Sequence, residues 1–443
     1  MDEFKEVNEN YTLAEAIAEA KRCLRCKSPL CKKGCPIGND MPEWIDELSR
    51  GNFGNAMAIL NRRTNLPAVC GRVCAHERQC EDACVLNKQG RHIHIGKLER
   101  FVADFDWEAG LTHSDHRDAG RGSVAVIGSG PAGLTIAGDM AREGFKVDIY
   151  EMEPEPGGVL MFGIPEYRLP KEVVAREIRR IEDLGVRIFL QTTVGRDLTI
   201  DDLFAKGYDA IFMGTGTGKP RRLPIPGAEH PGVRQAIWFL RRVSLYQAGL
   251  IELKEVIVGN NDRVAVIGCG NTAMDAARTA LRMGSKEVTI IYHRTINEMS
   301  ALKAEYDEAV AEGVKFMWKT SVTEIHPGEG NLLSSITLDT EGVKSELPVD
   351  RVIMAVGSVP ASRIVSTTEG IEVDGKGYVL TREEPYGMTT RRGVFAGGDV
   401  TNRPATVVHA MRDAKKVAES MMTYVDAKRL MERLDAEETP RVK

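Results

Sequence analysis

The 443-residue chain is too long for one hydrophobic core, and its length predicts about three domains. Hydrophobic residues make up 42%, charged residues 28%, and the net charge is −5, so the composition is that of a globular protein without the basic footprint of a nucleic-acid binder. Because no apolar run approaches the ~18 residues of a membrane span and the N-terminus is acidic, we expect a cytoplasmic protein that binds neither membrane nor nucleic acid.

The first 120 residues, which we call the cysteine head, carry both helix signals and most of the cysteines. Thr12 to Glu15 form a capping box, and Asp40-Met41-Pro42 has the residues of a second helix start. Eight of the nine cysteines fall between Cys23 and Cys84. Clustered cysteines in an intracellular protein indicate metal or redox chemistry rather than disulfides. We therefore predict a helical metal-binding domain over 1–120, whose end is a polar linker at 114–122.

The first four cysteines are spaced like a ferredoxin run. They read Cys23-x2-Cys26-x4-Cys31-x3-Cys35-Pro36, with two extra residues before the third cysteine. In two-cluster ferredoxins the cysteine before Pro binds the other cluster, so this spacing predicts one [4Fe–4S] centre on the first three cysteines and a second that includes the fourth. The later set is Cys70, Cys74, Cys80 and Cys84. The alternative is a pair of four-cysteine zinc sites, whose ligands usually come as two short cysteine pairs.

The first nucleotide-binding pattern follows the linker. A strand predicted over 123–127 leads into a G-x-G-x-x-G loop and a helix, with Gly128, Gly130, Pro131, Ala132 and Gly133 as the expected nucleotide contacts. Glycines allow the tight turn and the approach of a pyrophosphate to the helix N-terminus. The second strand ends at Glu151, which is placed to bond the adenosine ribose.

The same strand–loop–helix–strand pattern recurs from Arg263 to Arg294. Its loop supplies Gly268, Gly270, Asn271 and Thr272, and Cys269 is most simply a small loop residue. Where the first unit has Glu151, the second has His293, followed by Arg294. An acid would repel a 2′-phosphate and an arginine would attract one, so the pair favours NADPH over NADH. The alternative is that both residues simply end a strand in solvent.

The remaining segments complete a two-domain nucleotide-binding body. Apolar strands ending at Gly216 and Gly357 are interpreted as crossings between the two domains. They give a FAD-binding domain over 121–232 and 359–443 and an NADP(H)-binding domain over 233–358. No cysteine lies between Gly133 and Cys269, so the dithiol of disulfide reductases is missing, and the nine histidines show no metal-type spacing.

A segment near the C-terminus identifies the first nucleotide as FAD. Residues 393–400 read GVFAGGDV and resemble the second FAD fingerprint of two-dinucleotide-domain flavoproteins, with Gly398 and Asp399 near the ribityl or pyrophosphate group. A helix predicted from about Ala405 brings Thr406 and Val407 to the site and aims its positive end at the flavin. The charged residues after Asp426 are predicted to be a solvated tail.

Together these motifs resemble the small subunits of NADPH-dependent glutamate synthase, with the large subunit of ferredoxin:NADP transhydrogenase and the N-terminal half of dihydropyrimidine dehydrogenase as relatives. The resemblance spans the whole chain and also rests on the motifs at 156–160, 163–170 and 268–275, which supply Gly158, Arg168 and Asp275 as cofactor contacts. It implies an α/β fold: a helical head with two [4Fe–4S] clusters, followed by two Rossmann-like domains for FAD and NADP(H).

The resemblance also implies a ligand set. The second cluster would take Cys35, Cys74, Cys80 and Cys84, and the first would take Cys23, Cys26, Cys31 and an oxygen ligand, which matches Glu99. Counting cysteines alone would choose Cys70 in place of Glu99. The sequence departs from the family pattern at His293, usually Arg, and at Cys269, usually Gly.

The expected activity is electron input. NADPH would reduce FAD, and single electrons would leave through the clusters to a large catalytic subunit of the glutamate synthase type. The alternative is the large subunit of an electron-bifurcating transhydrogenase, whose partners are a small flavoprotein and ferredoxin, and no residue separates the two. A third class, a zinc-stabilised scaffold with degenerate nucleotide folds, would be colourless when purified.

Overall fold

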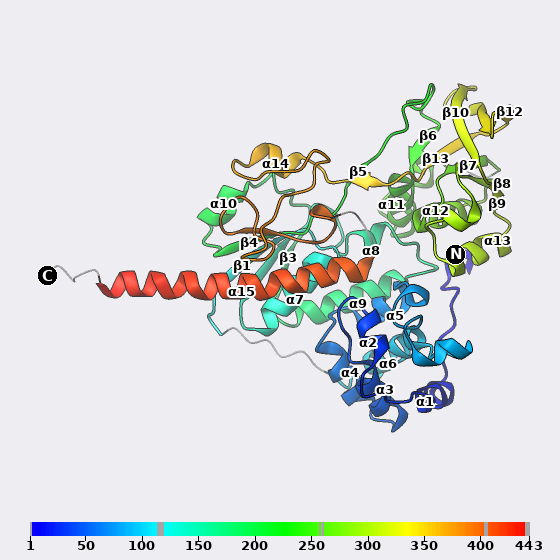
Figure 1. Ribbon diagram of the computed structural model, residues 1–443. Helices are drawn as coiled ribbons and strands as arrows, with labels where there is room; N and C mark the ends of the chain where they lie inside the picture. The colour runs from blue at the N-terminus through cyan, green and yellow to red at the C-terminus, as the bar shows by residue number, and fades with distance from the viewer. Residues whose placement is uncertain (1, 113–118, 257, 259–260, 403–405, 439–443) are drawn as a thin grey trace. The chain divides into compact units, whose positions relative to one another are not determined.

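The computed structural model describes residues 2–112, 119–256, 258, 261–402 and 406–438 (Figure 1). Part of the predicted linker, residues 114–118, and the predicted helix start at Ala405 lie outside these residues. The chain divides into two compact units. The smaller unit comprises 1–7, 161–170 and 219–358, and the larger unit comprises 8–160, 171–218 and 359–443. The head therefore belongs to the same unit as the strands predicted to bind FAD. Residues 161–170 were predicted to belong to the FAD-binding domain, but they pack in the unit predicted to bind NADP(H).

The cysteine head is helical, as predicted. Thr12 accepts a hydrogen bond from Glu15 N, and the reciprocal bond from Thr12 N completes the capping box. Met41, Trp44, Ile45 and Leu48 recur at helical spacing and are all buried, which explains why that helix packs inward. The elements are α1 (Leu13–Lys21), α2 (Leu30–Gly34), α3 (Met41–Ser49), α4 (Phe53–Asn61), α5 (Pro67–Val73), η2 (His76–Arg78), η3 (Val85–Gln89) and α6 (Ile95–Ala109).

The rest of the larger unit is a five-stranded parallel sheet in the order β15-β4-β1-β2-β3, with helices beside it (Figure 1). Its strands are near-continuous apolar runs, as expected where both faces of a parallel sheet are covered. The strands are β1 (Ser123–Ile127), β2 (Lys146–Tyr150), β3 (Arg187–Phe189), β4 (Ala210–Met213) and β15 (Val394–Ala396). The helices are α7 (Pro131–Arg142), α9 (Lys171–Glu182), α10 (Ile200–Ala205), α14 (Arg363–Thr367), η6 (Gly398–Val400) and α15 (Val407–Glu438); α8 (Val159–Phe162) is where the chain leaves this unit.

The segment after Asp426, predicted to be a solvated tail, is mostly exposed, and it is helical because α15 continues to Glu438. Asp426 pairs with Arg121, and Arg429 pairs with Asp209, residues that precede strands β1 and β4. Only beyond them do the apolar side chains of Leu430, Met431 and Leu434 become exposed.

The smaller unit repeats the parallel architecture, with sheet order β6-β13-β7-β8-β9, and adds an antiparallel sheet, β10-β11-β12. The parallel strands are β6 (Val233–Gln235), β7 (Arg263–Ile267), β8 (Glu287–Ile291), β9 (Lys315–Met317) and β13 (Arg351–Met354). The antiparallel strands are β10 (Thr320–Pro327), β11 (Leu333–Thr340) and β12 (Val343–Leu347), and the short strands β5 (Lys219–Pro220) and β14 (Ser358–Val359) come before and after this segment in sequence. The helices are η1 (Asp2–Phe4), α11 (Ala236–Gln247), η4 (Leu253–Glu255), α12 (Asn271–Arg282), η5 (Ile296–Glu298) and α13 (Lys303–Ala311).

Strand register brings the predicted nucleotide segments together within each unit. In the larger unit Ile127 pairs with both Tyr150 and Met213, and Met213 pairs with Ala396. The residues after these strand ends therefore meet at one edge of the sheet, which is where open parallel sheets bind ligands. The smaller unit does the same, since Ile267 pairs with Ile291 and Met354. Among the described residues, none of the helices combines the length and the apolarity that crossing a membrane requires.

Candidate cofactor sites

The glycine loop after β1 is closed so tightly that only glycine fits. Gly128 has φ +94°, and a Cβ on Gly133 would lie 1.9 Å from Gly128 O. Gly130 is different, because a Cβ there would meet no atom within 4 Å. The loop thus leaves open space in front of the N-terminus of α7, where backbone N–H groups and the helix dipole favour an anion such as a pyrophosphate. Pro131 begins this helix, where its missing N–H costs nothing.

Two other predicted FAD segments touch this loop. A Cβ on Gly158, which has φ +54°, would lie 2.9 Å from Gly130 Cα. A Cβ on Gly398, with φ +77°, would lie 3.1 Å from Ala132 Cβ. The glycine loop at 128–133 and the segment at 393–400 lie more than half the chain apart in sequence. They therefore form a single cradle, which added side chains would fill. The residues present fit a dinucleotide.

Glu151 follows β2 at the same edge and braces the glycine loop. Its Oε2 accepts hydrogen bonds from the Ser129 backbone N at 2.8 Å and from the Ser129 hydroxyl, and that hydroxyl accepts from Gly157 N at 2.9 Å. The sequence analysis missed this role of Ser129, although its position between two glycines was visible. The predicted bond from Glu151 to a ribose stays a prediction.

The other predicted contacts lie along the same edge of the sheet. Gly216 has φ +60° and open space beside it, and Asp399 is half-buried in η6. The Thr406 hydroxyl is 2.7 Å from His409 Nδ1, and Val407 begins α15. Their contacts to FAD remain predictions.

The second glycine loop has the same construction in the smaller unit. A Cβ on Gly268, at φ +122°, would lie 2.4 Å from Ala355 O, and Gly270 caps α12. Asn271 Oδ1 accepts from Leu302 N at 2.8 Å, which ties the loop to the next segment. Thr272 is exposed in the first turn of α12, and Gly357 has φ +89° with open space beside it.

His293 and Arg294 are both exposed and come one residue after the end of β8. Because β8 pairs with β7 in parallel, they stand at the edge where the glycine loop begins. This placement is the one that reading a ribose 2′-substituent requires.

Arg168 and Asp275 were both predicted to contact cofactor, and they bind each other. Arg168 Nη1 donates to both Asp275 oxygens at 2.9 Å, and its Nη2 lies 2.6 Å from Glu305. Burial opposes the charge of Arg168, but the carboxylates of Asp275 and Glu305 outweigh it and raise its pKa. The adjacent Tyr167 ring lies 4.6 Å from the Arg278 guanidinium and 3.9 Å from that of Arg282. These contacts anchor 161–170 within the smaller unit.

The cysteines of the head form two groups. Cys23, Cys26, Cys31 and Cys84 line one small cavity of about 30 Å³ together with apolar side chains such as Ile45. Burial, with smaller contributions from the neighbouring Cys23 and Cys84, raises the pKa of the Cys31 thiol to about 11. Thiols packed this closely need a cation to become thiolates together, and an iron centre supplies it.

The second group contains Cys35, Cys70, Cys74, Cys80 and the carboxyl group of Glu99. Burial raises the pKa of Cys35 and of Cys80, and the nearby Glu99 raises both further. A hydrogen bond with the Cys70 thiol, burial and Glu99 raise that of Cys74. Glu99 is 4% exposed, and its Oε1 has no hydrogen-bond partner among the described residues. Burial and the nearby Glu177 raise the pKa of Glu99 to about 8, so this carboxylate also fits a cationic neighbour.

Close glycine contacts bring these segments together. A Cβ on Gly34 would lie 2.7 Å from Ala83 Cβ, which sets α2 against the segment that carries Cys80 and Cys84. A Cβ on Gly71 would lie 2.5 Å from Arg100 N, which sets α5 against α6 and brings Cys74 towards Glu99.

Which four ligands share a cluster stays a prediction. Cys84 lines the cavity with Cys23, and the close approach of Gly34 to Ala83 also sets Cys35 beside the segment that carries Cys84. The charge of Glu99 acts on Cys35, Cys74 and Cys80. Tertiary packing of this kind has no counterpart in cysteine spacing.

The fold and these sites define a class: a flavoprotein oxidoreductase with two dinucleotide-binding domains and an iron–sulfur head. Residues 1–111 match the family described as dihydropyrimidine dehydrogenase domain II, 4Fe-4S cluster, and 122–414 match the pyridine nucleotide-disulphide oxidoreductases. Among solved structures the chain is similar to FprA of Mycobacterium tuberculosis, with TM-score 0.57, 20% identity and coverage of 70% of this chain and 86% of that one. It is also similar to Lactococcus lactis thioredoxin reductase, with TM-score 0.54, 25% identity and coverage of 69% and 99%.

Curated relatives match nearly end to end. The glutamate synthase [NADPH] small chains of Halomonas elongata and Escherichia coli are each 34% identical over 96% of this chain and 94% of their own length. The E. coli NAD-dependent dihydropyrimidine dehydrogenase subunit PreT is 32% identical over 95% and 97%. The chain belongs to the glutamate synthase small chain family. It is an oxidoreductase, and its cofactors are FAD, NADP(H) and [4Fe–4S] clusters.

Proposed function

We propose that the chain is the NADPH-oxidising subunit of a glutamate synthase and passes its electrons to a large catalytic subunit. The observation that carries this proposal is the similarity to glutamate synthase small chains over 96% of this chain, which includes the head as well as both nucleotide-binding units. The relatives are named small chains, which implies a large partner chain that would convert glutamine and 2-oxoglutarate.

In this proposal the larger unit holds FAD on the glycine loop at 128–133, with Glu151 and Asp399 at its two ends. Bound flavin supplies the conversion between two-electron hydride transfer and one-electron transfer. The protein itself contributes orientation: a rigid loop, a helix N-terminus for the pyrophosphate, and burial of the acidic brace at Glu151. The smaller unit would hold NADPH on Gly268 and Gly270.

The head is tied directly to the FAD-binding helix, which supports a short path for electrons. Asn65 Nδ2 donates to Thr135 O at 3.0 Å and to Asp139 Oδ1 at 2.9 Å, both on α7. A Cβ on Gly138 would lie 2.8 Å from the Asn65 amide, so the contact depends on glycine. The cysteine groups are therefore held in the same compact unit as the flavin loop.

For the clusters we propose the ligand set that the family resemblance implies. One [4Fe–4S] centre would take Cys23, Cys26, Cys31 and Glu99, and the other would take Cys35, Cys74, Cys80 and Cys84. Cys70 also lies by Cys74, but its sulfur already has neighbours in Thr64 Oγ1 at 3.7 Å and Met411 Sδ at 3.8 Å. Glu99 is favoured because its buried Oε1 needs a partner.

The test is reconstitution with the product as readout. The purified chain with NADPH should reduce an artificial acceptor but form no glutamate from glutamine and 2-oxoglutarate until a glutamate synthase large subunit is added. A chain with both Cys74→Ser and Cys84→Ser is the matched control: it should keep acceptor reduction at the flavin and lose glutamate formation. Glutamate formation by the chain alone would refute the proposal. Purification of the tagged chain from its own host with a small flavoprotein, and without a large subunit, would favour the transhydrogenase instead.

A further inference from the structure

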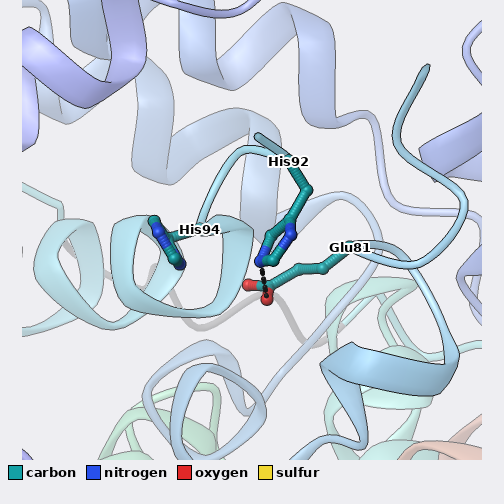
Figure 2. A group of neighbouring side chains, drawn as sticks. All are labelled: Glu81, His92 and His94. Atoms are coloured by element: carbon teal, nitrogen blue, oxygen red, sulfur yellow. Dashed lines mark ion pairs between the residues drawn. The ribbon is translucent and has the colours of Figure 1, made fainter. Parts of the chain in front are cut away.

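A histidine pair and a carboxylate that are not among the expected cluster ligands converge in the head, where Glu81 directly follows Cys80. Glu81, His92 and His94 each offer one ligand atom, and these atoms all lie within 4.8 Å of one another. Figure 2 shows the two imidazoles beside one another, with the Glu81 carboxylate next to His92. Glu81 Oε2 is 3.4 Å from His92 Nε2, and the two ring centroids are 4.9 Å apart. We propose that these three residues bind one divalent transition-metal ion of the Zn²⁺ type.

The local backbone explains why the side chains meet. His92 and His94 are one residue apart in a non-helical segment before α6, so both rings reach the same side. Glu81 comes from the loop between Cys80 and Cys84. Its Oε1 accepts a hydrogen bond from Gly96 N at 2.9 Å, in the first turn of α6, where a negative charge is stabilised by the helix dipole. The second oxygen, Oε2, is left facing His92.

The ligand-bearing backbone is fixed without any ion. His94 N donates to Glu19 Oε1 at 2.9 Å, and Ile95 N donates to Ile93 O at 2.8 Å. The site is also open on one side, since the side chain of His92 is 32% exposed and His94 is not buried. A preformed and accessible set of ligands lets an ion enter and keep water in its remaining position.

The donor set matches a particular class of metal. Two imidazole nitrogens and one carboxylate oxygen are the ligands of three-coordinate protein sites for Zn²⁺ and similar borderline ions, with water as the fourth ligand. Tetrahedral bonds of ~2.1 Å separate ligand atoms by about 3.4 Å, which is the separation Glu81 and His92 already have. Rotation of the His94 side chain would bring its ring nitrogen from within 4.8 Å to the same separation.

The charges around the site are mixed. Glu19 adds a carboxylate, which is paired with Arg22, and the ammonium of Lys97 lies over the Tyr11 ring at 5.4 Å. A bound ion would link the loop that carries Cys80 and Cys84 to the helix that carries Glu99. It would therefore stabilise the head, whichever partner receives the electrons.

The test uses the tag-free holoprotein, purified without oxygen and carrying its flavin and iron. After equilibrium dialysis against ZnCl₂, zinc and iron are measured on the same sample. We expect one zinc per chain in the wild type, with iron unchanged and a raised thermal midpoint. His92→Ala/His94→Ala should weaken zinc binding by at least tenfold, the scale on which even supporting residues of metal sites act. His230→Ala/His326→Ala removes two imidazoles elsewhere and should bind like the wild type.

Two outcomes would overturn the proposal. Equal zinc uptake by the wild type and His92→Ala/His94→Ala would show that the histidines are not ligands. Zinc uptake matched by loss of iron would place the zinc on the cysteines. If the double variant fails to fold, Glu81→Gln keeps the bond to Gly96 and removes only the charged ligand, so unchanged zinc affinity in that variant is equally decisive.

Discussion

Replacing Gly130 by alanine should weaken FAD binding without disturbing the fold. A Cβ at this position meets no protein atom within 4 Å, and the φ of −70° is one that alanine adopts without strain. The added methyl group therefore enters only the open space in front of α7, which we assign to the pyrophosphate.

The expected loss can be worked from the geometry. A methyl group between the loop N–H groups and a phosphate oxygen removes at least one charge-assisted hydrogen bond, about 1.5–3 kcal/mol or roughly ten- to a hundredfold in affinity. Gly133→Ala should behave differently. Its Cβ would lie 1.9 Å from Gly128 O, against an ordinary carbon–oxygen contact of about 3.3 Å, so the loop itself must open by more than 1 Å. Overpacking of that kind costs about 1–3 kcal/mol of stability.

The assay is titration of flavin-free protein with FAD, followed by quenching of flavin fluorescence, with iron content and thermal midpoint as checks of folding. Gly375→Ala is the matched control, because a Cβ there also meets nothing within 4 Å. Gly130→Ala should lose affinity with an unchanged midpoint, Gly133→Ala should lower both, and Gly375→Ala should change neither. Wild-type FAD affinity in folded Gly130→Ala would refute the assignment of the loop.

Three further predictions test other parts of the account. Arg294→Ala should weaken NADPH binding by about 1.5–3 kcal/mol and leave NADH nearly unchanged; equal losses would show that Arg294 does not read the 2′-phosphate. Cys70→Ser should keep all the iron and Glu99→Ala should lose the iron of one cluster, and the reverse result would make Cys70 the ligand. Asp275→Asn leaves buried Arg168 with Glu305 alone, so it should cost about 3 kcal/mol, the low end for breaking a buried pair. Hydrogen exchange in residues 161–170 should then rise, and unchanged exchange would contradict the anchoring role.

The nucleotide-binding units were predictable because their signals are local. The strand at 123–127, the loop after it and the second strand before Glu151 form one continuous pattern, and the structure has β1 and β2 where that pattern put them. The same holds for the capping box at Thr12, whose hydrogen bonds join residues three apart. Short-range geometry of this kind is written in residue type and spacing.

What could not be predicted depends on contacts between distant segments. Cysteine spacing gave eight candidate cysteines, but which of them share a cluster depends on Gly34 and Gly71, whose missing side chains decide which helices touch. Arg168 has its partner in Asp275, more than a hundred residues away. The histidines had no metal-type spacing by themselves, and His92-x-His94 gains meaning only when Glu81 folds back onto α6.

We infer above all that this chain takes electrons from NADPH without a partner. The direct test is to mix the purified holoprotein with NADPH in the absence of oxygen. The measurement is the flavin absorbance, followed by stopped flow. We predict that NADPH bleaches the flavin of the chain alone, in a protein whose cysteines hold iron. A colourless protein, or a flavin that stays oxidised with NADPH until a second subunit is added, would contradict it.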